Sequence, residues 1–180
     1  LPGLRLGTHY RWLRLVLMQA LAAMEMNPVP RGKPAAWFVL EEFAALGHVR
    51  AIETAAGYMA GFGVKLWAVL QDISQLRTHY RDSWETFLGN AGIIQAFGNV
   101  DNSTLEYLSK RLGEVVISER RSVFTSSTQR AAGHPGEETQ VRSVPLLAPF
   151  EVEQHFAAST KRHLILVSGE RPTYMRRLGD

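Results

Sequence analysis

The sequence predicts an α/β fold with a mostly parallel sheet flanked by helices. Two observations favour this class. Short apolar runs of strand length alternate with longer segments in which apolar residues recur at helical spacing. The apolar runs are continuous, which is typical of strands that are buried on both faces. A hydrophobic fraction of 46% over 180 residues is sufficient for the core of one such domain.

The first half of the chain predicts two strands and the helices around them. Apolar residues recur at helical spacing over residues 8–26, and the prolines within residues 27–34 end that helix. A short apolar run predicts a strand over residues 35–40. A helix is expected over residues 47–59, and a second apolar run predicts a strand over residues 64–70.

The second half of the chain continues the alternation of helices and strands. We expect a helix in two pieces over residues 73–90, a strand over 92–98, a helix over 101–112, a strand over 114–118, a turn and short helix within 145–156, and a strand over 163–169. Residues 119–143 are polar and lack periodicity, so they predict a flexible loop and no boundary between two large domains.

Several classes of function are excluded by composition. A net charge of +3 gives no general argument for nucleic-acid binding. The absence of cysteine excludes disulfides and thiolate metal sites. The histidines are scattered without H-x-x-x-H or H-E-x-x-H, and G-x-S-x-G is absent, so neither a zinc site nor a nucleophile elbow is predicted. No apolar run approaches the roughly 20 residues that span a bilayer. The Leu at position 1 suggests a processed or truncated chain.

Polar residues follow two of the predicted strands at their carboxyl ends. Glu41 and Glu42 follow the strand at 35–40, and Gln71 follows the strand at 64–70. Functional groups of an open parallel sheet lie just beyond these ends. Nucleotide hydrolysis needs one acid to position Mg²⁺, a second to orient the attacking water and an amide to sense the γ-phosphate. Solvated Glu and Gln are also common where strands simply end, so the residues alone leave both interpretations open.

Four segments in sequence order resemble the type IV secretion coupling proteins, the TraG/TraD-like conjugal transfer ATPases. They are FVLEEFAALGHV, GFGVKLWAVLQDISQL, WETFLGNAGIIQAFGNVD and TLEYLSKRLGE. The first and last segments of the chain are similar to the flanks of this family, so the resemblance covers nearly the whole chain. It implies a RecA/FtsK-like P-loop NTPase core, of which residues 1–180 would be the C-terminal half.

The resemblance also implies an ATP and Mg²⁺ site in the complete protein. Glu42 matches the catalytic Glu of the Walker B motif, and Gln71 matches the glutamine that senses the γ-phosphate. Glu41 stands where the family has the Asp that directs Mg²⁺ through water. Because Glu is one methylene longer, we expect weakened positioning of the metal. No G-x-x-x-x-G-K-[ST] loop occurs in the sequence, so the isolated chain is expected to be inactive as an ATPase.

The same family implies the setting in which the protein works. Its members form a ring, usually a hexamer, at the cytoplasmic face of the bacterial inner membrane, with membrane segments that this chain lacks. Their partners are relaxase–DNA complexes or secreted proteins and the components of the secretion channel. Arg77, Arg81, Lys110 and Arg111 could contact DNA or a neighbouring subunit, although each also suits a solvated helix face. The alternative function is a non-catalytic remnant or interaction module that binds sister subunits or relaxosome proteins.

Overall fold

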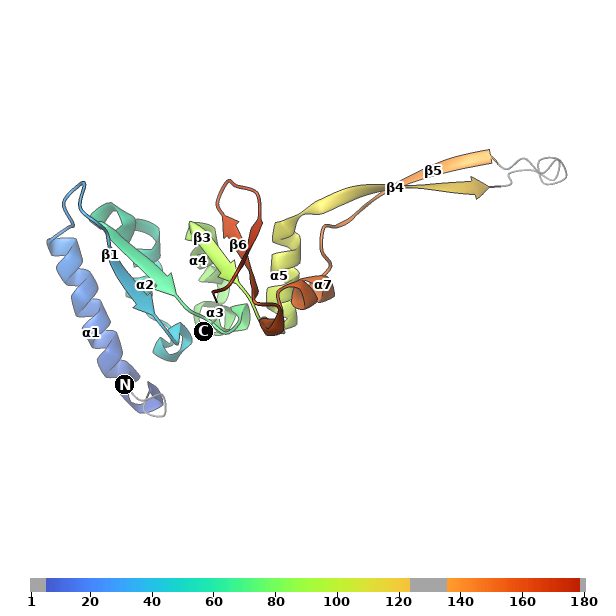
Figure 1. The fold of residues 1–180 in the computed structure, drawn as a ribbon. Helices are drawn as coiled ribbons and strands as arrows, with labels where there is room; N and C mark the ends of the chain where they lie inside the picture. Colours follow the sequence, from blue (N-terminus) through green and yellow to red (C-terminus); the bar gives the residue numbers. More distant parts are fainter. Residues whose placement is uncertain (1–5, 124–135, 179–180) are drawn as a thin grey trace.

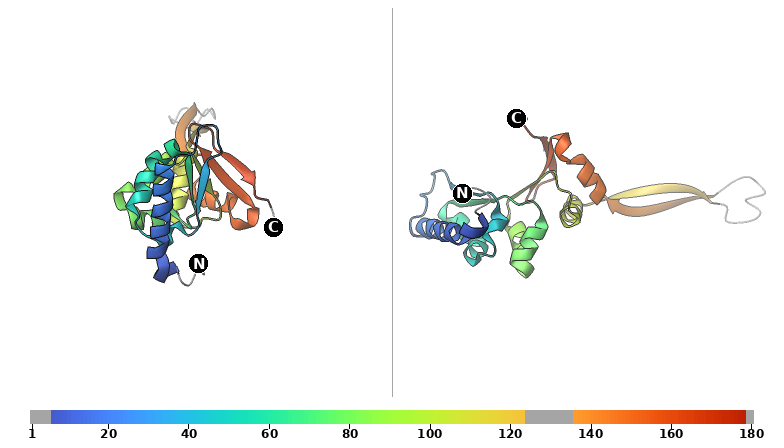
Figure 2. Two further views of the ribbon diagram at one scale, coloured as in Figure 1. Left: turned by 90° about the vertical axis from the view of Figure 1, so that its left-hand side faces the viewer. Right: turned by 90° about the horizontal axis from the view of Figure 1, so that it is seen from below.

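The structure, a computed structural model, describes residues 6–123 and 136–178. It is elongated, with α1 near one end and the long strand pair β4–β5 extending from the other (Figures 1 and 2). The elements are α1 (Leu6–Met26), β1 (Ala36–Leu40), η2 (Phe43–Leu46), α2 (Arg50–Tyr58), η3 (Met59–Phe62), β2 (Val64–Ala68), α3 (Ile73–Tyr80), η4 (Arg81–Ser83), α4 (Trp84–Asn90), β3 (Ile93–Ala96), α5 (Asn102–Leu112), β4 (Glu114–Val123), β5 (Gly136–Pro145), α7 (Pro149–His155), η5 (Ala158–Thr160), β6 (Arg162–Val167) and β7 (Thr173–Arg176).

The first hydrophobic core lies between the parallel pair β1–β2 and the helices around it. The register runs from Ala36 opposite Val64 to Leu40 opposite Ala68. Burial alternates along β1, so one face of the pair points into the core. The buried residues of this core are Leu17, Leu21, Phe43, Leu46, Val49, Ile52, Met59, Val64, Leu76 and Tyr80. The core therefore joins α1, α2, α3 and the segment that follows β1.

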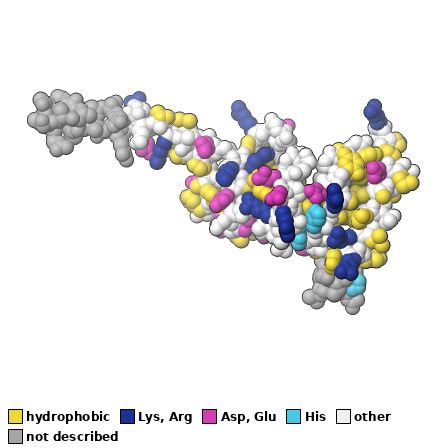
Figure 3. Space-filling view, turned by 180° about the vertical axis from the view of Figure 1, so that it is seen from behind, with side chains coloured by type: hydrophobic (Ala, Val, Ile, Leu, Met, Phe, Trp, Pro, Cys, Tyr) yellow, Lys and Arg dark blue, Asp and Glu magenta, His cyan; other side chains and the backbone are white. Residues whose placement is uncertain are grey.

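The other face of the β1–β2 pair is open and apolar. Trp37 and Trp67 are 58% and 50% exposed, and their ring centroids lie 6.1 Å apart. Val39 and Val69 are also exposed. Hydrophobic side chains gather at the end of the molecule where α1 and this pair lie (Figure 3). Parallel strands are usually covered by helices on both faces and carry apolar residues on both. The exposed face of this pair therefore has the composition of a face that is normally buried.

The second hydrophobic core is built on an antiparallel sheet in the order β3-β6-β7. Helices α5 and α7 contact each other beside it, and the buried residues are Ala96, Leu105, Leu108, Val152, Phe156, Leu164 and Leu166. The two cores are joined by polar contacts. The Ile73 N–H donates to the Thr104 hydroxyl oxygen at 3.0 Å, and the Asn99 amide donates to the Gln71 carbonyl at 3.2 Å.

Strand direction differs from the expectation of a mostly parallel sheet. Only β1–β2 is parallel among the strand pairs of the described residues, and the pairs β3–β6, β6–β7 and β4–β5 are antiparallel. The physical reason is that a continuous apolar run reports burial on both faces and carries no information on direction. The short strand β7, whose residues are all exposed, was not expected from the sequence.

The expectation of a loop over residues 119–143 is corrected by the structure. Over the described residues this stretch forms much of β4 and β5, whose register runs from Glu114 opposite Pro145 to Val123 opposite Gly136. Polar residues suit a strand pair that is solvated on both faces, because the backbone ladder requires no apolar alternation. Residues 124–135, which also fell within that prediction, lie outside the described part of the chain.

Candidate functional site

The parallel register of β1 and β2 brings the predicted polar residues to one edge of the pair. Pairing continues one step beyond both strands, because the Val69 N–H donates to the Leu40 carbonyl at 3.0 Å and the Phe43 N–H donates to the Val69 carbonyl at 3.2 Å. Glu41 and Glu42 lie inside this connection on one side, and Gln71 follows it on the other. The sequence expectation that these residues share a sheet edge is therefore met by the backbone.

Glu42 has a left-handed backbone, with φ 51° and ψ 42°. This conformation costs a residue other than Gly about 1–2 kcal/mol, so it persists only where the surroundings impose it. The next residue, Phe43, is only 2% exposed and begins η2, whose end at Gly47 also has a positive φ. The buried Phe43 thus fixes a strained turn that directs the Glu42 side chain away from the core.

Glu41 and Glu42 are both exposed and line a groove of about 620 Å³ beside α1. The rest of the lining is apolar and comes from α1, β1 and η2, namely Leu13, Val16, Leu17, Ala20, Phe38, Val39, Leu40, Ala45 and Leu46. Two adjacent carboxylates at an apolar groove form the only acidic part of its lining. A cation or a polarised water is the ligand that such a pair attracts.

Gln71 is held through its backbone on both sides. Its N–H donates to the side-chain oxygen of Gln75 at 3.1 Å, and its carbonyl accepts from Asn99. Asp72 then caps α3 by accepting from the Gln75 N–H at 3.0 Å. The start of α3 therefore fixes the Gln71 backbone, and the residue remains exposed at the edge of the pair.

Asn99 was not identified from the sequence, although it follows the same rule as Gln71. It comes after β3 at the carboxyl end of that strand and donates to Gln71. Its side-chain oxygen is buried and has no hydrogen-bond partner among the described residues. The ends of β2 and β3 thus converge on one polar site, and position after a strand end was the signal that could have found Asn99.

The donor set fits Mg²⁺ shared with water and phosphate better than a metal held by protein alone. In the part of the chain that the structure describes, no three His, Asp or Glu side chains gather as a metal-binding group. Mg²⁺ usually takes one or two carboxylates and completes its octahedron with water and phosphate oxygens. Glu41 and Glu42 can supply these one or two carboxylates.

The basic candidates do not gather at this site. The Arg77 guanidinium lies 4.3 Å from the centroid of the Trp84 ring and donates to Ser103 at 3.4 Å, so it links α3, α4 and α5. Arg81 is exposed, with a positive φ of 41° after α3. Lys110 and Arg111 are exposed in the last turn of α5, at the opposite end of that helix from the Asn99 contact.

Comparison with known proteins gives a consistent result. Residues 6–179 match the profile of a family described as type IV secretory system conjugative DNA transfer. Over 168 residues the chain is 28% identical to the protein VirD4 of Rhizobium rhizogenes, covering 92% of this chain and 24% of that protein. Over 130 residues it is 30% identical to the conjugal transfer protein TraG of Escherichia coli, covering 69% of this chain and 20% of TraG. The chain thus spans a fifth to a quarter of the length of these relatives.

Solved structures of the plasmid coupling protein TrwB have a similar fold. The complex of TrwB with the non-hydrolysable ATP analogue ADPNP aligns with a TM-score of 0.67 and 15% identity, over 94% of this chain and 37% of TrwB. An unbound form of TrwB aligns with a TM-score of 0.66 and 18% identity, over 93% and 36%. This likeness shows that the chain shares the fold of part of TrwB, and it confirms the expected α/β class. Within the described residues, no helix is both long enough and apolar enough to cross a bilayer.

Proposed function

We propose that this chain, which belongs to the type IV secretory system conjugative DNA transfer family, is the C-terminal segment of a coupling ATPase motor. In this proposal the complete protein couples ATP hydrolysis to the recruitment and transfer of DNA or protein substrates into a secretion channel. The observation that carries it is the shared edge of β1 and β2, where Glu42 is held in a strained turn and lies beside the segment that leads to Gln71. Strained backbone at a polar sheet edge favours a functional site over a simple strand end.

Each polar residue at this edge has a proposed role. Glu42 is the general base that orients the attacking water, and Gln71 senses the γ-phosphate. Glu41 directs Mg²⁺ through water in place of the Asp of the family. The neighbour structures of TrwB contain ADPNP in one case and ADP with Mg²⁺ in another, which supports ATP and Mg²⁺ as the ligands of the complete protein. A phosphate-binding loop is supplied by another part of the motor, since the sequence has no G-x-x-x-x-G-K-[ST].

The open face of β1–β2 supports the assignment to a larger domain. Trp37, Val39, Trp67 and Val69 are exposed although parallel strands are normally covered on both faces. Helices from the rest of a motor domain would cover them. The proposed setting is a homo-oligomeric ring at the cytoplasmic face of the inner membrane, with relaxase–DNA complexes or secreted proteins and channel components as partners.

A mating experiment tests this function. The Glu42 codon is changed to Gln in the gene that contains this chain, and conjugative transfer is counted beside a strain with Glu170→Gln, a change at an exposed acid between β6 and β7. We expect transfer to fall by at least about 100-fold in the first strain only, since a general base contributes about 10²–10⁴-fold. Protein abundance is measured in both strains. Undiminished transfer at normal abundance contradicts the role of Glu42.

The second candidate is a non-catalytic module that keeps the fold and binds sister subunits or relaxosome proteins. The absence of a phosphate loop from the 180 residues favours it. The chain is mixed with an intact coupling protein, and the mass of the rings and their ATP hydrolysis are measured with the parent chain and with its Glu42→Gln variant. If the chain enters the rings and Glu42→Gln does not change their hydrolysis, the non-catalytic module is supported. If Glu42→Gln lowers their hydrolysis, the motor is supported.

A further inference from the structure

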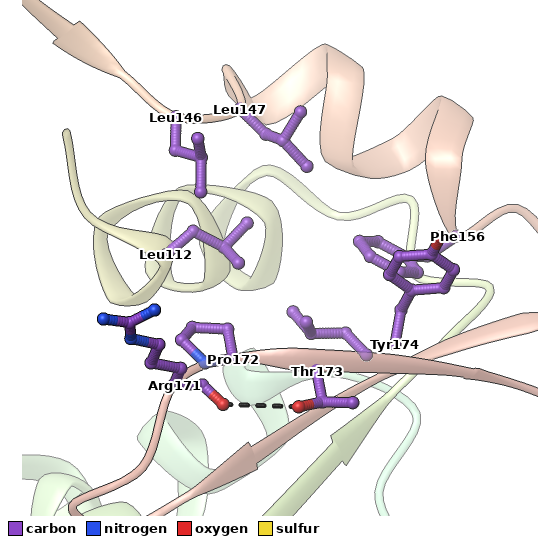
Figure 4. Close-up of a pocket in the computed structure, with 9 residues that line it drawn as sticks. Leu112, Leu146, Leu147, Phe156, Arg171, Pro172, Thr173 and Tyr174 are labelled. Atoms are coloured by element: carbon purple, nitrogen blue, oxygen red, sulfur yellow. Dashed lines mark hydrogen bonds between the residues drawn. The ribbon is translucent and has the colours of Figure 1, made fainter. Parts of the chain in front are cut away.

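A second cavity lies in the other half of the molecule, away from the edge of β1–β2. It has a volume of about 330 Å³ and lies between the end of α5, the segment leading to α7, and β7 (Figure 4). Its lining is almost entirely apolar and consists of Leu112, Leu146, Leu147, Phe156, Leu164, Pro172 and Tyr174, with Thr173 and Arg171. This volume is at the lower end of the range for ligand pockets, about 300–1,000 Å³, so it suits one or two apolar side chains.

Arginines stand at both ends of this pocket. Arg171 belongs to the lining and lies beside Pro172 (Figure 4). At the other end, Arg162 of β6 lies directly opposite Arg176 of β7, two register positions from the Leu164–Tyr174 pair that lines the pocket. Residues two apart on a strand share a face, so Arg162 and Arg176 are on the pocket side of the sheet. The Arg162 guanidinium lies 5.8 Å from the centroid of the Tyr174 ring.

These three arginines form no ion pair with the part of the chain that the structure describes, and all three residues are exposed. Like charges directly opposite each other in an antiparallel pair destabilise the pair. Arg162 and Arg176 therefore occupy an arrangement that an anionic partner would stabilise.

From these observations we propose that the pocket binds an acidic peptide segment of a partner protein, with one apolar side chain inserted between flanking carboxylates. The apolar side chain enters the pocket, and the carboxylates meet Arg171 at one end and the Arg162–Arg176 pair at the other. Arg171 and Arg176 are five residue steps apart, which is at most roughly 16 Å at about 3.3 Å per residue. Carboxylates two to three residues on either side of a central Leu span a similar length.

A peptide fits this surface better than a nucleic acid. The lining contains two neutral side chains with a hydroxyl group, Thr173 and Tyr174. The Thr173 hydroxyl already donates to the Arg171 carbonyl at 3.4 Å. The aliphatic lining therefore offers few groups that could read the edge of a base, whereas it matches an aliphatic side chain. The proposal concerns substrate or partner docking and does not depend on the ATP site.

Fluorescence anisotropy with defined peptides tests the proposal on the 180-residue chain. The probe is a labelled Glu-Glu-Ser-Leu-Ser-Glu-Glu peptide. Two control peptides replace the Leu by Ser or all the Glu by Gln, and a 20-nucleotide oligo-dT serves as a polyanion without an apolar anchor. We expect the probe to bind at least about tenfold more tightly than either control peptide, because the charged and apolar contacts act together.

Variants of the chain test the location of the site. Arg162→Gln with Arg176→Gln removes the paired cations, and Leu146→Trp fills the pocket from a half-exposed position. The matched control, Arg31→Gln with Lys33→Gln, removes the same charge from an exposed loop in the other half of the molecule. We expect the first two variants to weaken the probe by about tenfold or more and the control to change its affinity by less than about twofold.

A variant with reversed charge distinguishes binding at this site from a general attraction between the basic chain and an acidic peptide. Arg162→Glu with Arg176→Glu is expected to reject the acidic probe and to accept a peptide in which Lys replaces every Glu around the Leu. Circular dichroism establishes that each variant is folded. Equal binding of the Leu and Ser peptides, or unchanged binding by the arginine variants, overturns the proposal. Preferential binding of oligo-dT also overturns it and assigns the surface to single-stranded DNA.

Discussion

The rings of Phe43 and Tyr80 lie parallel, with an interplanar angle of 2° and a centroid distance of 5.9 Å. Phe43 directly follows Glu42, and Tyr80 ends α3. Both rings also contact Phe87 of α4. This aromatic cluster therefore connects the turn that presents the proposed general base to the helix that begins just after Gln71.

Truncation of Phe43 is predicted to destabilise the fold severely. Phe43→Ala removes a side chain that is 2% exposed and leaves a cavity beside Tyr80 and Phe87. The free energy of unfolding, measured by urea denaturation, should fall by about 3–5 kcal/mol. Phe150→Ala is the control, because Phe150 is 60% exposed and its loss should change stability by less than about 0.5 kcal/mol. Equal effects of the two changes would show that the first core does not depend on Phe43.

Glycine at position 42 is predicted to stabilise the fold while removing the proposed base. Glu42 has φ 51°, a conformation that Gly adopts without strain. Glu42→Gly should raise the free energy of unfolding by up to about 1 kcal/mol after the entropy of the unfolded Gly is subtracted. Glu41 does not have a positive φ, so Glu41→Gly should lower stability by about 0.5–1 kcal/mol instead. Thermal melting of both variants compares them, and destabilisation by Glu42→Gly contradicts the strained turn.

The contact between Ile73 and Thr104 is predicted to hold the two cores together. Thr104 is 4% exposed, and its hydroxyl oxygen accepts from the Ile73 N–H. Thr104→Val keeps the shape and leaves that N–H without a partner, which should cost about 1–3 kcal/mol. Thr78→Val is the matched control, since the exposed Thr78 hydroxyl donates only to the Ser74 carbonyl within α3. Denaturant unfolding of the two variants should differ by that amount, and similar stabilities would contradict a structural role for Thr104.

Alkaline pH is predicted to weaken the first core through Tyr80. Burial raises the pKa of Tyr80 above its ordinary value of 10.0, against a smaller lowering by the hydrogen bond from Val49. A raised pKa in the folded state means that this stabilisation is complete below the unfolded pKa and is lost as pH rises through the folded pKa. Unfolding free energies measured from about pH 8 to 11 should fall less steeply in Tyr80→Phe than in the parent chain. A steeper or equal fall in Tyr80→Phe would contradict this role of the buried Tyr80 hydroxyl.

Periodicity predicted much of the fold, and strand-end rules selected part of the candidate site. Continuous apolar runs located β1, β2, β3 and β6, and the rule that function lies beyond strand ends selected Glu41, Glu42 and Gln71. Asp101 was expected to begin a helix, and it caps α5 by accepting from the Thr104 N–H. These features depend on local sequence, which is why they could be predicted from it.

Other features depend on contacts between distant residues. The strand predicted over residues 114–118 is the first half of β4, but its continuation and its pairing with β5 were missed because a solvated ladder leaves no hydrophobic pattern. The sequence proposed Arg77 as a candidate for DNA contact and did not show that its guanidinium contacts Trp84 and Ser103. The left-handed turn at Glu42 is imposed by the burial of Phe43, and residue type gives no sign of it. The sequence alone did not show the hydrogen bond from the Asn99 amide to the Gln71 carbonyl, because this bond joins segments that follow two different strands.

ATP turnover by the complete protein that contains this chain tests the central claim most directly. The parent and the Glu42→Gln variant are compared for steady-state hydrolysis and for equilibrium binding of ATP with Mg²⁺. We predict that kcat falls by at least about 100-fold in the variant while ATP affinity remains within about threefold, because a general base acts mainly in the transition state. Hydrolysis at the parent rate by a folded variant would contradict the assignment of the β1–β2 edge as the catalytic half of the motor.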